Sequence, residues 1–111
     1  MTFEYLISTM HQKDFSLIER MNINHNSIIV NQCDEYNFYL IERDGFYIKW
    51  FNVKERGLSR SRNIALSKAT ADICLLVDDD EVFYDNTPMV VLDSFKNNKK
   101  ADVFVFNLES I

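Results

Sequence analysis

The chain has 111 residues, of which 47% are hydrophobic and 26% charged, a balance typical of one globular domain. Its 17 acidic residues outnumber the 12 basic ones and give a net charge of −5, so it lacks the excess of positive charge typical of proteins that bind nucleic acid. Two cysteines are too few for a disulfide scaffold, which favours a reducing, cytoplasmic location. No apolar run approaches the roughly 20 residues that a membrane-spanning helix needs.

The first third of the chain predicts a strand, a short helix and a second strand. Residues 3–9 (F-E-Y-L-I-S-T) form an apolar run that ends in small hydroxyl residues. Ser16 and Glu19 have the S-x-x-E spacing of a helix N-terminus. The β-branched segment 27–30 begins the second strand, which we expect to end at Asp34.

The middle of the chain is less regular. Residues 36–42 are compatible with either a strand or an irregular segment. Gly45 marks a turn, and residues 46–53 (F-Y-I-K-W-F-N-V) are predicted to form a strand. A polar stretch around Gly57 then leads into a helix with apolar residues at positions 64–66.

The last third predicts one strand, one helix and another strand. Residues 72–77 are the most apolar segment of the chain. Thr87 and Pro88 are typical of a helix start, with Thr87 as the N-cap, and that helix should run to about Asn97. Residues 101–108 are predicted to form the final strand.

Strands that alternate with helices predict an α/β fold: a single domain over residues 1–111 with a Rossmann-like, mostly parallel sheet and flanking helices. Ligands of such sheets bind beyond the carboxyl ends of the strands. Polar clusters follow three of the predicted strands, at Asp34, at residues 55–62 and at residues 78–80. We therefore expect these clusters to lie at the same edge.

The acidic cluster L-L-V-D-D-D-E directly follows the most apolar strand. On an extended chain, alternate side chains point the same way, so Asp78 and Asp80 should share a face and Asp79 should point away. Two carboxylates suit Mg²⁺ or Mn²⁺, which fill their other positions with water and phosphate. The alternative is a solvated acidic turn before the next helix.

Three arginines, Arg56, Arg60 and Arg62, lie within seven residues of this otherwise acidic chain. They flank the start of a helix, which itself favours anions, and arginine binds phosphate through two parallel hydrogen bonds. The alternative is a solvated helix face. Asp34, at the end of an inner strand, is placed to bind a base or ribose, or else simply forms a strand-ending turn.

Three passages resemble the glycosyltransferases of family 2, which have the GT-A fold. Residues 6–10 (L-I-S-T-M) resemble the family's first strand. Residues 57–72 (G-L-S-R-S-R-N-I-A-L-S-K-A-T-A-D) resemble its G-x-x-x-A-R-N-x-G loop and helix, and residues 73–81 (I-C-L-L-V-D-D-D-E) its strand ending in Asp-x-Asp. The chain departs from the family's Asp-Gly-Ser turn at Cys33-Asp34-Glu35.

The resemblance implies a role for each matching residue in binding a UDP- or GDP-sugar. Asp34 would bond the nucleotide base and Asp78 the ribose. Thr9 and Arg62 would lie at the nucleotide sugar, and Asp80 would coordinate Mn²⁺ or Mg²⁺ on the diphosphate. The transfer would serve polysaccharide biosynthesis, and the resemblance leaves open whether the full-length protein associates with a membrane.

The resemblance covers the nucleotide-sugar-binding N-terminal half of such a domain, and no residue here corresponds to the general base. We therefore expect this chain to be incomplete and not to turn over substrate on its own. Two other functions stay open. One is a non-catalytic α/β module that binds a partner or forms a homo-oligomer, and the other is a different nucleotide-handling enzyme with Asp-x-Asp, such as a nucleotidyltransferase.

Overall fold

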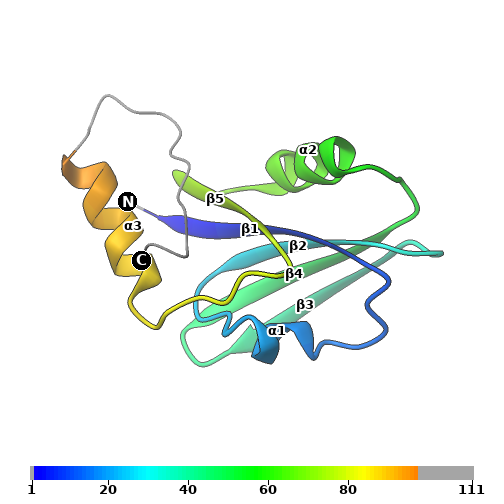
Figure 1. Ribbon diagram of the computed structural model, residues 1–111, viewed down its shortest axis with the longest axis horizontal. Coiled ribbons are helices and arrows are strands. Elements are labelled where there is room, and N and C mark those ends of the chain that lie inside the picture. Colours follow the sequence, from blue (N-terminus) through cyan, green and yellow to red (C-terminus); the bar gives the residue numbers. More distant parts are fainter. Residues whose placement is uncertain (1, 98–111) are drawn as a thin grey trace.

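The computed structural model describes residues 2–97, apart from the side chain of Asn97, and contains one five-stranded sheet with three helices (Figure 1). The strand order is β3-β4-β2-β1-β5, with every neighbouring pair parallel except β3 and β4. This confirms the predicted α/β class and mostly parallel sheet. The elements are β1 (Phe3–Met10), α1 (Leu17–Arg20), β2 (Ser27–Gln32), β3 (Asn37–Arg43), β4 (Phe46–Val53), α2 (Leu58–Lys68), β5 (Ile73–Asp78) and α3 (Thr87–Asn97).

Strand β1 lies between β2 and β5, and the order of strands along the chain reverses at this point. Its residues are buried on both faces as far as Thr9, which explains the nearly continuous apolar run. Parallel pairing brings the carboxyl ends of β1, β2, β4 and β5 to one edge of the sheet. In such folds the ligand crevice lies at that edge, beside the reversal.

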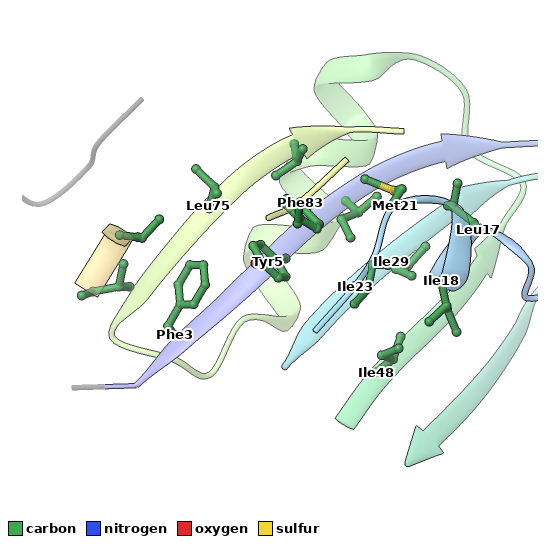
Figure 2. Packing of buried hydrophobic residues seen from close by; sticks show 14 of the residues in the cluster. Phe3, Tyr5, Leu17, Ile18, Met21, Ile23, Ile29, Ile48, Leu75 and Phe83 are labelled. Atoms are coloured by element: carbon green, nitrogen blue, oxygen red, sulfur yellow. The ribbon is translucent and has the colours of Figure 1, made fainter. Parts of the chain in front are cut away.

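Alternation along β1 divides the core into two layers. Its odd-numbered residues, such as Phe3 and Tyr5, pack with residues of α1 and α3, as Figure 2 shows for many of them. The Tyr5 ring stacks on Phe83 with the ring centres 3.7 Å apart. The even-numbered Leu6 packs in the other layer with Ala65 of α2. Helix α2 and helix α1 thus cover opposite faces of the sheet (Figure 1).

The segment left open by its sequence is strand β3, at the sheet's edge. It pairs antiparallel with β4 through a turn at Asp44 and Gly45, where the φ angle of +83° suits glycine. Phe38 and Leu40 are 53% and 54% exposed. A half-buried strand normally alternates buried apolar residues with exposed polar ones. Residues 36–42 lack that alternation because their exposed positions also carry apolar side chains, so the sequence did not identify the strand.

Two helix starts differ in detail from their predictions. Helix α1 begins after Ser16 as expected, but the Ser16 side chain makes no capping hydrogen bond. Instead, the backbone N–H of Ser16 donates to Asp14 Oδ1 at 3.0 Å. A bond from the Ser16 hydroxyl and this one from the Ser16 N–H favour the ionised carboxylate and lower the pKa of Asp14. Thr87 is the first residue of α3 and not its N-cap, and its Oγ1 accepts a bond from the N–H of Tyr84 at 2.9 Å.

The predicted strand over 101–108 lies outside the described residues. Within residues 2–97, no helix combines the length and the apolar character needed to cross a membrane.

Candidate functional site

A cleft of about 410 Å³ opens at the carboxyl edge of the sheet, between the ends of β1 and β5 and the start of α2. This is the edge predicted to bind a ligand. Its acidic wall consists of Asp78, Asp79 and Asp80, which follow one another along the chain. The remaining lining residues come from β1, β2 and the start of α2: Ser8, Thr9, Met10, Gln32, Gly57 and Leu58.

The three aspartates do not lie along an extended strand. Strand β5 ends at Asp78, and the next two residues form a turn. Because the register of β1 and β5 places Ser8 opposite Asp78, the residues that follow, Thr9 and Asp79, meet just beyond the pair. The Thr9 hydroxyl donates to Asp79 Oδ2 at 2.7 Å. The prediction that Asp79 points away from the site is therefore wrong, because side-chain alternation stops where the strand ends.

The segment after the acidic turn, which consists of Asp78, Asp79 and Asp80, is anchored to the residues that follow α1. Phe83 is buried, and its N–H donates to the carbonyl of Met21 at 2.8 Å. The Asn22 amide donates to the carbonyl of Phe83 at 2.9 Å, and that of Asn24 to the carbonyl of Tyr84 at 3.0 Å. The acidic turn is thus held between strand β5 and a fixed loop.

Arg62 of α2 forms an ion pair with Asp78, with 3.3 Å between Nη2 and Oδ1. Both side chains are about half exposed, so water screens the pair and it adds little stability, about 0–1 kcal/mol. Its consequence is electrostatic: it places a positive charge beside the acidic wall. The other two aspartates have no ion pair with a basic group among the described residues.

The N-terminus of α2 also faces the cleft. Gly57 precedes the helix with a φ of +106°, which suits glycine, and as the N-cap residue it has no side chain with which to cap the free N–H groups. The Gly57 carbonyl accepts a bond from Gln32 Nε2 at 2.8 Å, and the Ser61 hydroxyl donates to that of Ser8 at 2.9 Å. These bonds tie the start of α2 to β2 and β1, so its N–H groups stay at the cleft, where they attract anions.

A model of the protein family described as "Glycosyl transferase family 2" matches residues 11–110. The match spans nearly the whole chain. The chain belongs to glycosyltransferase family 2. Searches of the curated proteins and of the solved structures found no match. Membership implies a nucleotide-sugar donor at the level of the family, whose members commonly use divalent metals.

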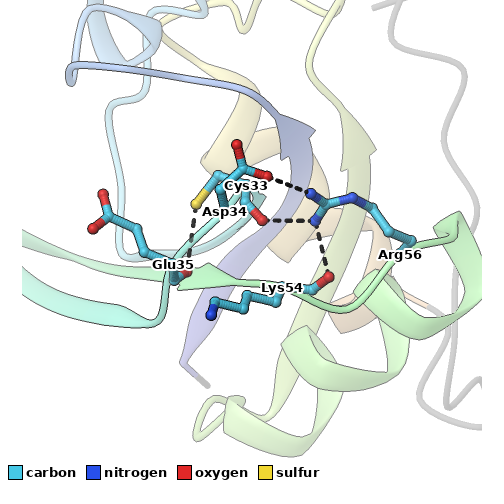
Figure 3. A network of polar contacts seen from close by, with 5 residues as sticks. All are labelled: Cys33, Asp34, Glu35, Lys54 and Arg56. Atoms are coloured by element: carbon cyan, nitrogen blue, oxygen red, sulfur yellow. Dashed lines mark hydrogen bonds and ion pairs between the residues drawn. The ribbon is translucent and has the colours of Figure 1, made fainter.

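In this glycosyltransferase domain, Asp34 lies outside the cleft. Its side chain is 95% exposed and pairs with Arg56 at 3.1 Å. Arg56 also donates to the carbonyls of Cys33 and Lys54, at 2.8 and 2.9 Å (Figure 3). The guanidinium therefore joins the ends of β2 and β4. Asp34 lines a neighbouring hollow of about 440 Å³ together with His11 and other residues.

The structure thus brings together Thr9, Asp78 and Asp80 in one cleft, with Arg62 paired to Asp78 at its side. Gln32 was not predicted as a site residue, yet it is buried at the carboxyl end of β2 and lines the cleft. A signal was available, since the apolar run of residues 27–30 is followed by two amides. The prediction at the end of this strand was Asp34, the next acidic residue, instead.

The acidic turn fits a hard cation that needs few protein ligands. Among residues 2–97, no three His, Cys, Asp or Glu side chains are grouped closely enough to hold a metal on their own. Asp80 makes no hydrogen bond or ion pair within this part of the chain, so its oxygens are free for a ligand. Mg²⁺ and Mn²⁺ usually take one or two carboxylates and complete their shell with water and phosphate, and this turn can supply that set.

Proposed function

We propose that this domain binds a nucleoside-diphosphate sugar, with UDP or GDP as the nucleotide, together with Mn²⁺ or Mg²⁺, for glycosyl transfer to an acceptor. The observation that carries the proposal is the charge arrangement of one cleft. Uncompensated carboxylates on one wall face an open helix N-terminus on the other, and Arg62 adds a positive charge beside the cleft through its pair with Asp78. A phosphate–metal complex has the complementary pattern, with negative oxygens around a positive centre.

Each wall has a separate task in this proposal. Asp80 holds the divalent cation, and Asp78 contacts the ribose. Arg62 keeps Asp78 in place and adds positive charge beside the nucleotide, while the N–H groups after Gly57 face the phosphates. When bound, the cation would offset the negative charge that builds on the departing nucleoside diphosphate.

Nucleotide titrations test this function. Calorimetry with UDP and with GDP, each with and without Mn²⁺, should show binding that depends on the metal, and Asp80→Ala should abolish that dependence. Asp93→Ala is the matched control, because Asp93 is an exposed carboxylate on α3. Failure of both nucleotides to bind in the presence of Mn²⁺ would refute the proposal. Preference for a nucleoside triphosphate would instead favour a nucleotidyltransferase.

The exposed apolar residues of β3 favour a second candidate function, an interaction module. Tyr36, Phe38 and Leu40 are each more than half exposed on or beside an open sheet edge. Concentration-dependent association in analytical ultracentrifugation, unaffected by nucleotide and abolished by Leu40→Lys, would support a homo-oligomer built through this edge. A cytoplasmic location and association of the full-length protein with a membrane stay predictions.

A further inference from the structure

The hydroxyl group of Thr9 has a partner on each side. It donates to Asp79 Oδ2 at 2.7 Å and accepts a bond from Gln12 Nε2 at 2.9 Å. A hydroxyl can donate only one hydrogen bond, and here that bond goes to Asp79. Thr9 is also only 5% exposed. It therefore has no proton left to donate to a nucleotide, and we expect it to act on a ligand through Asp79.

Arg20 determines which way the Gln12 amide faces. Arg20 Nη2 donates to Gln12 Oε1 at 2.8 Å. Because a guanidinium only donates, the amide oxygen must face Arg20 and the NH₂ group must face Thr9. The backbone of Gln12 is fixed as well, by two bonds of 3.0 Å with the side chain of buried Asn31. The hydrogen bonds therefore run in one direction, from Arg20 to Gln12, from Gln12 to Thr9 and from Thr9 to the carboxylate of Asp79.

The three aspartates of the cleft are therefore not equivalent. The charge of Asp78 is partly offset by its ion pair with Arg62, whereas Asp79 accepts a hydrogen bond from the neutral hydroxyl of Thr9. Such a bond is strong because its acceptor is ionised, and it orients the carboxylate without neutralising it. The second oxygen of Asp79 makes no bond within the described residues, and Asp79 lines the cleft beside Asp80.

We propose that Asp79 is a further residue of the cation site, contributing an oxygen beside Asp80 while Asp78 stays with Arg62. Thr9, Gln12 and Arg20 are then positioning residues that fix the orientation of that oxygen. The inference rests on the proposed function, and it replaces the pair expected from side-chain alternation with two adjacent carboxylates. Hydrogen bonds behind a ligating carboxylate tune its metal affinity, commonly by about 10-fold or more.

Calorimetric titration with Mn²⁺ alone, and then with UDP or GDP in the presence of Mn²⁺, tests this arrangement. Asp79→Asn should weaken Mn²⁺ binding by at least about 10-fold, and Thr9→Val, which keeps the side-chain shape, by about 10-fold. Thr9→Ser retains the hydroxyl and should restore wild-type affinity. Because Thr9 acts through Asp79, the double variant should bind no more weakly than Asp79→Asn alone.

Gln12→Ala removes the donor to the Thr9 hydroxyl and should weaken Mn²⁺ binding by a smaller factor than Thr9→Val. This variant tests the positioning if Thr9→Val does not fold. Asp93→Asn, which removes one exposed carboxylate far along the chain, should leave Mn²⁺ affinity unchanged. A wild-type protein that binds neither Mn²⁺ nor the nucleotides would overturn the proposed function itself. Wild-type binding that Asp79→Asn leaves unchanged would overturn only the role of Asp79. Additive losses in the double variant would overturn the positioning by Thr9.

Discussion

Glu4, at the amino edge of the sheet, and the aspartates of the acidic turn, at the carboxyl edge, are carboxylates in contrasting environments. Glu4 is fully buried and accepts hydrogen bonds from the hydroxyl of Tyr47 and from the backbone N–H groups of Thr70 and Ala71. The aspartates are exposed, adjacent in sequence and almost without donors.

The charge of Glu4 stabilises the fold, whereas the charges of the aspartates are available to a ligand. Burial raises the pKa of Glu4, but the hydrogen bonds outweigh it, so the pKa lies below its usual value and the ionised form is favoured. Neighbouring aspartates repel one another and gain little in return from the fold. We therefore expect Glu4 to matter for stability, and the acidic turn to matter for binding at some cost in stability.

Replacing Glu4 should have the largest effect. Glu4→Ala removes a buried acceptor and leaves four donors without their partner: the hydroxyls of Tyr47 and Thr70 and the N–H groups of Thr70 and Ala71. The free energy of unfolding should therefore fall by about 3 kcal/mol. Urea denaturation measures the change. Glu42→Ala, on the exposed edge strand, should change the stability by less than about 0.5 kcal/mol. Equal effects of the two substitutions would remove the distinction between the two edges.

Acid should erase the same contribution. Since the pKa of Glu4 is lower in the folded protein, its stabilisation is complete above the ordinary glutamate pKa of 4.5 and is lost as the pH falls through the folded-state value. Stability measured from pH 7 downward should therefore decline below about pH 4.5 in the wild type, and less steeply in Glu4→Gln. Parallel curves for the two proteins would contradict this account.

Asp80→Asn should have the opposite pattern to Glu4→Ala. It removes one of three adjacent charges, so the free energy of unfolding without metal should stay constant or rise by up to about 0.5 kcal/mol. Mn²⁺-dependent nucleotide binding should nevertheless fall by at least about 10-fold. Thermal unfolding with and without Mn²⁺ reports both effects. A loss of stability in the metal-free protein would show that Asp80 supports the fold.

Arg62→Gln should have a smaller effect on binding. The exposed pair with Asp78 contributes at most about 1 kcal/mol to stability. Nucleotide affinity should fall by roughly 10-fold, because a charged hydrogen-bond donor beside the ligand is lost. The affinity should also depend less on salt than in the wild type. An unchanged affinity and salt dependence would exclude Arg62 from the site.

Asp34→Asn should have the smallest effect. The role of Asp34 at the nucleotide base stays a prediction, and its pairing with Arg56 outside the cleft favours a change in nucleotide affinity of less than about 2-fold, or 0.4 kcal/mol. Titration of UDP and GDP with Mn²⁺ decides the matter. A large, base-specific loss would place the base in the neighbouring hollow and would extend the site beyond the cleft.

Much of the fold follows from local patterns. The alternation of apolar strands with helices predicted the sheet, and the carboxyl-edge rule predicted where the acidic turn and Arg62 would lie. The orientation of Asp79 and the place of Gln32 were not predicted, because both depend on contacts between distant segments. Thr9 and Asp79 are 70 residues apart, and their bond follows from the register of β1 and β5, which no local pattern reveals. The same applies to Gln32, whose place at the cleft depends on Gly57.

Paramagnetic broadening by Mn²⁺ would show whether the cation binds at the acidic turn. Substoichiometric Mn²⁺ is added to ¹⁵N-labelled protein with UDP or GDP, and the amide signals that broaden locate the cation. We expect broadening centred on residues 78–80 and extending to Thr9 and the start of α2. Broadening around Asp34 and the neighbouring hollow, or no selective broadening with either nucleotide, would contradict it.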